Sequence, residues 1–385
     1  MNLKADDKKY IANTYARFDL NIVSGCGSVF YDENGKEYID LGTGIAVNTF
    51  GFCDESWKEA VVKQLDTFQH TSNLYYSKPC VTLAKLLCEK TGAKKVFFSN
   101  SGAEANECAI KAARKYAENK GIKDGVIVTL EQSFHGRTIT TLAATGQDVF
   151  HESFLPLTCG FVHAKANDCA DLERVVNDNN VIAIMFETVQ GEGGVLPLTK
   201  EFVDKIAEIA EKNDILMIVD EVQTGNGRTG ELYGYMNYGI KPDIVSTAKG
   251  LAGGLPIGAT MMFEKCEDVF QPGSHGSTFG GNPISCAAAV NVISRIDEKL
   301  LAEVKEKSEY IFNELSGAEG VKSVSGLGLM IGIETEKDAN EVLAKCLENG
   351  VSVLKAKTKI RLLPALNIPF EQLQKAIEVI KNALK

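Results

Sequence analysis

Residues 215–221 have the sequence Ile-Leu-Met-Ile-Val-Asp-Glu, and this stretch indicates the fold more directly than any other. Five consecutive apolar residues followed by two carboxylates are typical of a buried strand whose carboxyl end opens onto a polar site. The segment before it has apolar residues at the spacing of an amphipathic helix, namely Phe202, Ile206 and Ile209. A helix that leads into a buried strand predicts an α/β unit with parallel strands.

The same alternation continues on both sides of this strand. We expect helices at residues 102–119 and 201–211, and further strands at residues 95–99, 126–130, 181–187, 244–247 and 257–263. Strands that alternate with helices predict an α/β domain with a largely parallel sheet.

The two ends of the chain have a different pattern. Residues 28–30 and 37–40 flank the turn Glu33-Asn34-Gly35, which predicts a hairpin. Towards the C-terminus we expect one long helix at 287–304, and then strands at 324–333, 351–354 and 360–363.

These patterns suggest a division into domains. We assign residues 49–283 to a large ligand-binding domain. The N-terminal segment, residues 1–48, and the C-terminal residues 284–385 would together form a smaller α+β domain.

The composition limits the classes of partner. The chain has 385 residues, of which 44% are hydrophobic, and a net charge of -10. An acidic chain repels nucleic acid and anionic membrane surfaces, so we expect neither as a partner. The N-terminus is charged without an apolar core, and the ten cysteines include no Cys-x-x-Cys pair. We therefore expect a cytoplasmic protein with reduced thiols, no membrane span and no metal centre.

Lys249 follows an apolar strand and precedes a glycine-rich loop. A lysine becomes a nucleophile toward a carbonyl group when its surroundings lower its pKa. A solvated loop lysine would show the same local pattern, so Lys249 alone does not define a site. Asp220 adds to the case, because a carboxylate at the carboxyl end of a buried strand points into the usual ligand crevice of an α/β sheet.

An anion site is predicted where the strand 95–99 meets the helix 102–119. Ser101, Gly102 and Ala103 form this turn. Backbone amides at a helix N-terminus cradle an anion, although an ordinary N-cap uses the same residues.

Other polar and aromatic side chains follow the remaining strands. Phe134 can stack on a cofactor ring, and Arg137 can bind a carboxylate through two hydrogen bonds. Glu187, Gln190 and Glu192 follow the strand 181–187. Arg361 lies on a later strand, where it either faces the same cleft or lies on the surface.

Residues 225–230 fit the pattern Gly-x-Gly-x-x-Gly after a strand, which is also the signature of a dinucleotide site. Such a site needs a helix that begins at this loop, and residues 232–239 are a poor helix. Asp220 and Glu221 would also lie beside the pyrophosphate. We therefore reject a dinucleotide site.

Taken together, these segments resemble class III aminotransferases that depend on pyridoxal phosphate (PLP), most closely the acetylornithine/ornithine aminotransferase group. The matching stretches follow the family's order over nearly the whole chain: 35–40, 44–48, 99–106, 134–138, 190–194, 220–230, 249–259 and 276–283. The interval between Asp220 and Lys249 also fits that group. The resemblance implies the type I fold of PLP-dependent enzymes, an α/β fold with a mixed, mostly parallel, seven-stranded sheet in the large domain and a smaller α+β domain.

The resemblance also implies roles in cofactor binding. Lys249 would hold PLP as a Schiff base and then transfer the proton, and Asp220 would pair with the ring nitrogen. The other contacts to the ring and the phosphate would come from Phe134, Glu187, Val222, Gln223, Ser101, Gly102, Ala103 and, from the second subunit, Thr278.

Substrate roles follow from the same resemblance. Arg137 would bind the carboxylate remote from the reacting amine. Glu192 would mask Arg361 in one half-reaction and free it in the other to bind the α-carboxylate of glutamate or 2-oxoglutarate. Tyr15 and Ser277 would complete the substrate site.

The implied activity is transfer of the distal amine of N-acetylornithine to 2-oxoglutarate, a step of arginine biosynthesis, by a homodimer with shared active sites. Ornithine, succinylornithine, succinyl-diaminopimelate, lysine and 4-aminobutyrate remain alternative donors. A mutase, a decarboxylase or a non-catalytic relative that binds a partner are further alternatives. The sequence departs from the family's His-x-His-Pro-like segment at residues 51–56, and from its proline at Thr188.

Overall fold

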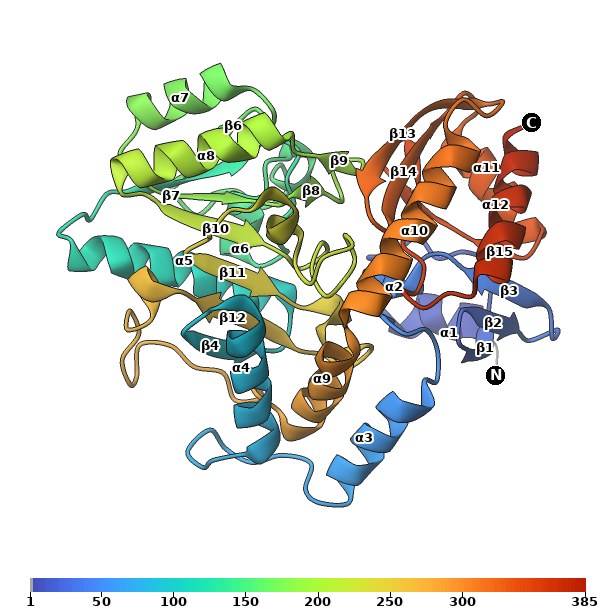
Figure 1. Ribbon diagram of the computed structural model, residues 1–385, viewed down its shortest axis with the longest axis horizontal. Coiled ribbons are helices and arrows are strands. Elements are labelled where there is room, and N and C mark those ends of the chain that lie inside the picture. The colour runs from blue at the N-terminus through green and yellow to red at the C-terminus, as the bar shows by residue number, and fades with distance from the viewer. Residues whose placement is uncertain (1–2) are drawn as a thin grey trace.

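The central feature of the computed structural model, which describes residues 3–385, is a seven-stranded sheet (Figure 1). Its strand order is β4 (Lys95–Ser99), β12 (Gly258–Met262), β11 (Ile244–Thr247), β10 (Leu216–Asp220), β7 (Val181–Phe186), β5 (Val126–Leu130) and β6 (Phe161–Ala164). β12 is antiparallel to both of its neighbours, β4 and β11, and the other neighbouring pairs are parallel. The predicted α/β fold with a mixed, mostly parallel sheet is therefore confirmed.

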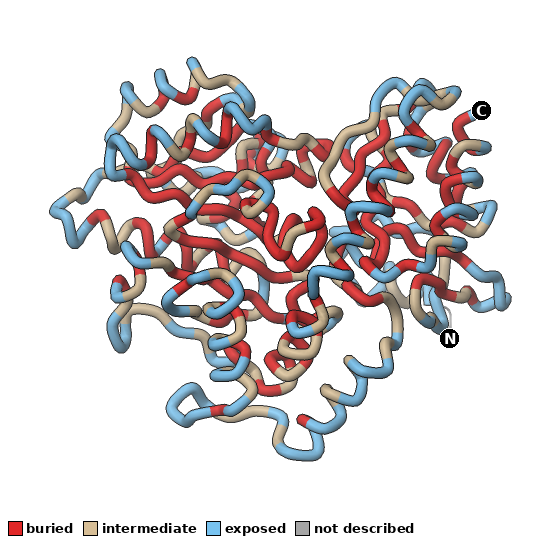
Figure 2. Tube along the Cα trace, in the orientation of Figure 1, coloured by how far each residue is buried: buried red, intermediate tan, exposed pale blue. Residues whose placement is uncertain are grey.

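Side chains on β10 alternate between the two faces of this sheet. Val219 packs in the core cluster that includes α8 (Lys200–Asn213), and Ile218 packs in the cluster that includes α5 (Gly102–Asn119). All five residues of β10 are buried, and Figure 2 shows buried residues along the strands of the sheet. Burial on both faces explains why the sequence of this strand is a continuous apolar run.

Two four-stranded sheets and the two-stranded pair of β8 (Val189–Gln190) and β9 (Leu196–Pro197) accompany the large one. The first has the order β1 (Ile22–Cys26), β2 (Val29–Asp32), β3 (Glu37–Asp40) and β15 (Val351–Ser352). The predicted hairpin is the antiparallel pair of β2 and β3, and β15 joins β3 in parallel. This pairing brings the two ends of the sequence into one sheet.

The second small sheet has the order β13 (Val321–Leu327), β14 (Met330–Thr335), β17 (Lys359–Leu362) and β16 (Leu354–Ala356). Helices from the same part of the chain accompany it: α10 (Glu298–Leu315), α11 (Ala339–Glu348) and α12 (Phe370–Leu384). These helices pack on the sheet and on one another, since α10 contacts β13 and α12, and α11 contacts β16, β17 and α12.

Three sequence predictions in this region are wrong, and one of them is the strand at 351–354, which the structure divides between β15 in the first small sheet and β16 in the second. The expected single helix at 287–304 is two helices, α9 (Pro283–Arg295) and α10, because Ile296 adopts an extended backbone and Asp297 caps α10. The carboxylate of Asp297 accepts a hydrogen bond from the amide of Leu300 at 2.8 Å. The expected strand at 324–333 is a hairpin that turns at Gly328, whose φ of +58° favours glycine.

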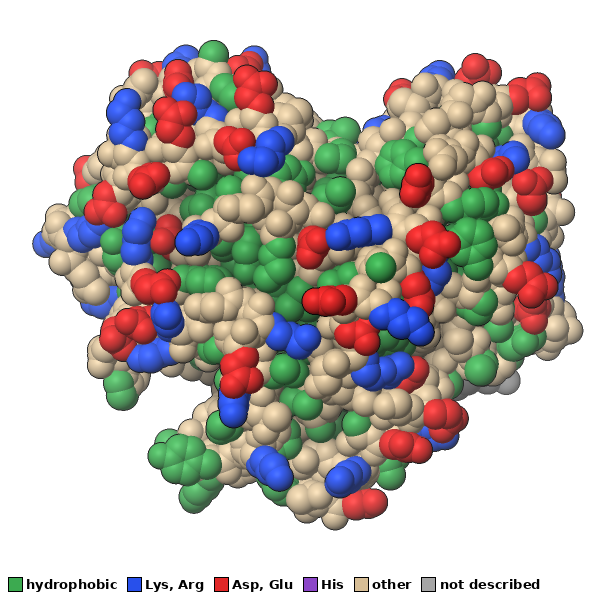
Figure 3. All heavy atoms as spheres, in the orientation of Figure 1, with side chains coloured by type: hydrophobic (Ala, Val, Ile, Leu, Met, Phe, Trp, Pro, Cys, Tyr) green, Lys and Arg blue, Asp and Glu red, His purple; other side chains and the backbone are tan. Residues whose placement is uncertain are grey.

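The remaining elements are α1 (Leu3–Tyr10), α2 (Thr43–Ala46), α3 (Glu55–Leu65), α4 (Lys78–Thr91), α6 (Ile139–Ala144) and α7 (Cys169–Asp178). Within residues 3–385, none of the helices combines the length and the apolar character needed to cross a bilayer. Acidic and basic side chains are interspersed over the face of the molecule in Figure 3.

Candidate active site

A cavity of about 430 Å³ lies at the carboxyl ends of the parallel strands. Strands β4, β5, β7, β10 and β11 each end beside it, so polar residues that are far apart in the sequence meet there. The predicted site residues among its lining are Ser101, Gly102, Ala103, Phe134, Arg137, Glu187, Asp220, Val222, Gln223 and Lys249.

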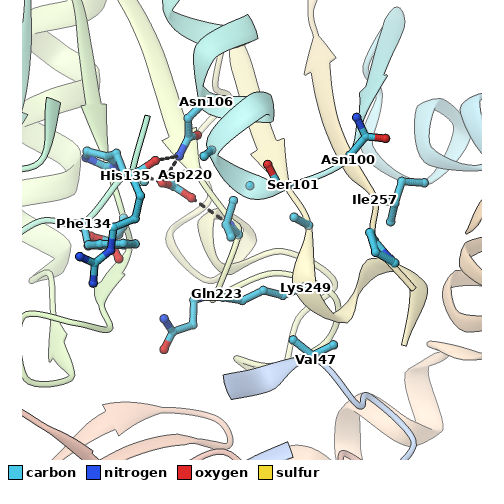
Figure 4. A pocket seen from close by; sticks show the side chains of 18 of the residues that line it. Val47, Asn100, Ser101, Asn106, Phe134, His135, Asp220, Gln223, Lys249 and Ile257 are labelled. Atoms are coloured by element: carbon cyan, nitrogen blue, oxygen red, sulfur yellow. Dashed lines mark hydrogen bonds and ion pairs between the residues drawn. The ribbon is translucent and has the colours of Figure 1, made fainter. Parts of the chain in front are cut away.

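Lys249 lies just after β11, with only Ala248 between it and the strand, and its side chain lines the cavity (Figure 4). Its backbone has a φ of +46°, a conformation that costs a non-glycine residue about 1 kcal/mol and persists only when its surroundings hold it. The next residue is fixed because the hydroxyl of Thr49 donates to the carbonyl of Gly250 at 2.8 Å. Burial lowers the pKa of Lys249, while the charge of Glu192 opposes this shift. The amine is therefore biased toward its neutral, nucleophilic form.

Asp220 ends β10 and is 3% exposed. Its carboxylate accepts hydrogen bonds from Asn106, His135 and the amide of Val222. Figure 4 shows Asn106 and His135 beside it, away from the open part of the cavity. Sequence reasoning did not single out Asn106 or His135, although His135 lies between Phe134 and Arg137 in a segment that it did select.

The N-terminus of α5 forms the predicted cradle for an anion. Ser101 is the N-cap, and its hydroxyl accepts a hydrogen bond from the amide of Glu104 at 3.2 Å. The amides of Gly102 and Ala103 have no acceptor within the part of the chain that the structure describes. A Cβ atom at Gly102 would lie 2.6 Å from Cγ1 of Val222, so only glycine allows this close approach.

Glu187 and Arg137 lie on the side of the cavity formed by β5 and β7. The carboxylate of Glu187 accepts hydrogen bonds from the amides of Phe134 at 2.9 Å and Gly191 at 3.3 Å. Burial raises the pKa of Glu187 to about 7. The guanidinium of Arg137 lies 4.7 Å from the ring centre of Phe150, and no carboxylate in residues 3–385 pairs with it. Arg137 is thus a cation available to an anionic ligand.

Arg361 reaches the same region from the second small sheet. Its Nη1 donates to Oε1 of Glu192 at 2.6 Å and to Oε1 of Gln223 at 3.2 Å. Gln223 also donates to Glu192 at 3.4 Å. Arg361 is 3% exposed, so this cation is buried with Glu192 as its charged partner. The structure therefore brings together the two residues predicted to form a switch.

Five predicted residues do not line the cavity: Glu192 and Arg361, which contact its lining residue Gln223, and also Ser277, Tyr15 and Thr278. The hydroxyl of Ser277 accepts a hydrogen bond from Asn100, which does line it, at 3.1 Å. Tyr15 is 71% exposed and lies against Arg17, and Thr278 is exposed. The proposed roles of Tyr15, Ser277 and Thr278 remain predictions.

The Gly-x-Gly-x-x-Gly segment has a structural role in this fold. The loop is followed by a short 3-10 helix, Gly234–Tyr238, and not by an α-helix. The guanidinium of Arg228 is buried in the loop and donates to the carbonyls of Leu329 and Pro364. The loop thus joins the large sheet to the second small sheet.

A lysine nucleophile, a strand-end acid and an anion cradle in one cavity are the arrangement of an enzyme that acts on amines and carbonyl compounds. The chain belongs to the class III aminotransferases, since the family model Aminotransferase class-III matches residues 10–384.

Individual relatives support this assignment over the whole chain. The acetylornithine aminotransferase of Haemophilus ducreyi is 49% identical, over 99% of this chain and 98% of that protein. The acetylornithine aminotransferase of Methanocaldococcus jannaschii is 41% identical, over 98% of this chain and 96% of that protein.

Solved structures agree with the fold. The ornithine aminotransferase of Toxoplasma gondii superposes with a TM-score of 0.95 at 32% identity, over 99% of this chain and 94% of that chain. The N-acetylornithine aminotransferase of Stenotrophomonas maltophilia has a TM-score of 0.85 at 32% identity, over 98% of this chain and 97% of that one. Another structure of the Toxoplasma enzyme has partial occupancy of PLP at its active site.

Proposed function

We propose that this chain is a PLP-dependent transaminase that moves the distal amine of N-acetylornithine to 2-oxoglutarate, which gives N-acetylglutamate semialdehyde and glutamate. The observation that carries the proposal is the gathering of Lys249, Asp220 and the free amides of Gly102 and Ala103 around one cavity. Relatives named acetylornithine aminotransferase at 39–49% identity over nearly the full chain support the choice of substrate.

The residues present fit PLP. The free amides at the start of α5 suit its phosphate, and the carboxylate of Asp220 suits the ring nitrogen. Phe134 and Val222 line the cavity, as a flat ring requires, and Gln223 supplies a polar group. When bound, PLP supplies an aldehyde that exchanges between amines and a ring that accepts electrons.

The protein's own residues would bind the substrates and move one proton. Lys249 would hold the cofactor through its Nζ atom, and when freed this atom would take and return the proton at the reacting carbon. Arg137 binds the carboxylate remote from the reacting amine. Separation of Glu192 from Arg361 exposes a second guanidinium, which would hold the α-carboxylate of 2-oxoglutarate or glutamate.

The acids around the cavity favour a donor whose α-amine is acylated. Of the described residues, only Glu187 and Asp220 supply carboxylates to the lining, and both already accept hydrogen bonds. Glu192 pairs with Arg361. A free α-ammonium group, as in ornithine, would therefore be buried without a charged partner, at a cost that an amide avoids.

We also propose a cytoplasmic homodimer in which Thr278 reaches the phosphate of the second subunit. Leu74 is 87% exposed, Tyr76 101% and Phe279 60%, which is unusual for large apolar side chains. Asn73 links the two segments, since its amide donates to the carbonyls of Ser277 and Gly280. These exposed side chains support a protein contact beside Thr278, and the ten free cysteines suit a reducing compartment.

We further propose the division into a large domain, residues 49–283, and a smaller one built from residues 1–48 and 284–385. Residues 1 and 2 lie outside the described residues. The parallel pairing of β3 with β15 supports the union of the two ends.

Visible absorbance of the PLP-loaded protein, with one amino donor at a time and no keto acid, tests the proposal. We expect N-acetylornithine to bleach the cofactor–lysine band, and ornithine and 4-aminobutyrate to leave it unchanged. Bleaching by a different donor alone, such as succinylornithine or succinyl-diaminopimelate, would keep the transaminase and replace its substrate. A protein that develops no band with added PLP would instead be a non-catalytic relative.

A further inference from the structure

The loop with the glycine pattern, residues 225–230, contacts the turn that carries the lysine of the cavity. Nδ2 of Asn226 donates to the carbonyl of Ala248 and to the hydroxyl oxygen of Thr247, each at 3.1 Å. The carbonyl of Ala248 belongs to the peptide bond that joins this residue to Lys249. Asn226 therefore holds the backbone of Lys249 on its N-terminal side.

The acceptors of Asn226 determine the orientation of its amide group. A backbone carbonyl can only accept, so the NH2 group must face Ala248 and Oδ1 must point away from it. Oδ1 has no hydrogen-bond partner within residues 3–385, and Asn226 is 3% exposed. A buried amide oxygen without a partner destabilises the folded state. The contribution of Asn226 therefore lies in the two hydrogen bonds that its NH2 group donates.

A second side chain, Thr49, holds the same turn on the C-terminal side of Lys249. Its hydroxyl donates to the carbonyl of Gly250 at 2.8 Å. The carbonyl of Thr49 accepts a hydrogen bond from the amide of Leu366 at 2.9 Å, and Thr49 is 2% exposed. Neither Thr49 nor Asn226 lines the cavity. Both therefore act on Lys249 through its backbone and not through a ligand.

The loop that carries Asn226 is itself anchored. Nη1 of Arg228 donates to the carbonyls of Leu329 at 3.1 Å and Pro364 at 2.5 Å, which lie beyond the large sheet. The backbone of Asn226 has a φ of +59°, a conformation that asparagine adopts more readily than most residues. A loop fixed in this way provides a rigid support for the turn.

The conformation of Lys249 requires such a support. Its φ of +46° lies in the left-handed region. Without restraint, a residue with a side chain favours right-handed over left-handed backbone by a factor on the order of ten. A change of φ would rotate the side chain of Lys249 relative to β11 and move Nζ from its place in the cavity. The apparent Kd of a ligand that bonds to Nζ rises in proportion as the competent conformation is depopulated.

We propose that Asn226, together with Thr49, is a positioning residue that holds Lys249 in its left-handed conformation with its side chain in the cavity. This inference rests on the proposed function, because PLP is the carbonyl compound to which Lys249 would bond. In that bond Nζ adds to the aldehyde carbon, and the aldehyde oxygen leaves as water with the two hydrogens of the neutral amine. The loop with the glycine pattern thus supports the lysine nucleophile.

The test compares the Kd of the apoprotein for PLP with its Kd for pyridoxamine phosphate, which carries an amine in place of the aldehyde and cannot bond to a lysine. Asn226→Gly deletes the side chain at a position whose φ suits glycine. We expect the Kd for PLP to rise about tenfold, the net value of about one hydrogen bond, and the Kd for pyridoxamine phosphate to remain unchanged. Thr49→Val, which removes a hydroxyl group, should cause the same selective loss.

Two controls show whether the effect passes through Lys249. Asn167 also has a positive φ, +61°, and donates its side-chain amide to a carbonyl, that of Pro197, at 3.2 Å. It does not line the cavity, so Asn167→Gly should leave both Kd values unchanged. In a Lys249→Ala background, Asn226→Gly should not change the Kd for PLP further, because the side chain that it positions is gone.

An unchanged Kd for PLP in Asn226→Gly would overturn the inference. Equal increases in the Kd values for PLP and pyridoxamine phosphate would also overturn it, since they would indicate a change in the shape of the cavity. If Asn226→Gly does not fold, Asn226→Ala, which adds no backbone freedom, decides the question by the same ratio of Kd values. A wild-type protein that takes up no PLP would refute the proposed function instead, so the two failures are distinguishable.

Discussion

Glu192→Gln removes the negative charge that holds Arg361 and keeps the volume of the side chain. Oε1 of Glu192 lies 2.6 Å from Nη1 of Arg361, which is 3% exposed. A hydrogen bond between charged groups at such a site contributes about 1.5–3 kcal/mol. The wild-type protein must give up this interaction before Arg361 can bind a second carboxylate. Because glutamine still offers a neutral acceptor, we take the lower limit, which corresponds to about a tenfold change in Kd.

The assay is a single-turnover half-reaction with glutamate or N-acetylornithine as the only donor. The dependence of the rate on donor concentration gives a Kd for each. We expect Glu192→Gln to lower the Kd for glutamate about tenfold and to leave that for N-acetylornithine unchanged or higher, since its carboxylate binds Arg137. The exposed Glu336→Gln is the control and should leave both values unchanged. A ratio of the two Kd values that is the same in Glu192→Gln as in the wild type would refute the switch.

Three further substitutions address other parts of the site. Burial raises the pKa of Glu221 from 4.5 to about 7. Between these two pH values the folded state keeps a proton on Glu221 that the unfolded state has already lost. The free energy of unfolding therefore falls as the pH rises from 4.5 to about 7. Glu221→Gln should remove most of this loss of stability, which is about 3 kcal/mol. The thermal midpoint of the variant should therefore change less than that of the wild type between about pH 5 and 7.5. An unchanged dependence of the midpoint on pH would contradict this prediction. Phe150→Leu removes the ring that lies 4.7 Å from Arg137, and should raise KM for the donor about threefold to tenfold with kcat unchanged. Gly102→Ala would place a methyl group 2.6 Å from Cγ1 of Val222, and should weaken PLP binding about tenfold by titration of the apoprotein; normal affinity would show that the cradle tolerates it.

The large sheet could be predicted from the sequence because its strands are buried on both faces. Continuous apolar runs such as that of β10 are typical of strands with both faces covered, and several of these runs lead into residues that line the cavity. Lys249 and Asp220 were identified for this reason, since Asp220 ends one such run and Lys249 follows another. The helix at 102–119 was predicted with the bounds that the structure has, because Ser101 is a clear N-cap.

The errors arose where periodicity continues across a break. The apolar spacing of α9 and α10 runs on through Ile296, and only the capping role of Asp297 reveals the change of direction. The hairpin of β13 and β14 contains apolar residues on both sides of Gly328, so its two strands resemble one. Apolar periodicity alone does not reveal where a single residue ends one element and begins the next.

Contacts between residues that are far apart in the chain could not be predicted from the sequence patterns. Asn106 lies 114 residues from Asp220, and Arg361 lies 169 residues from Glu192. Asn106 is an ordinary polar residue of a helix until the fold brings it to the end of β10. The pairing of Arg361 with Glu192 was expected only from the resemblance to a family, since a strand arginine gives no sign of its partner.

The central claim is that this cavity holds PLP through Lys249. Reduction of the PLP-loaded protein with borohydride fixes the cofactor to its lysine, and mass spectrometry of the peptides then identifies that residue. We predict one phosphopyridoxyl group per chain, on the peptide that contains Lys249, and none in Lys249→Ala, which should also lack steady turnover. A label on another lysine, or an equal label in Lys249→Ala, would contradict the account.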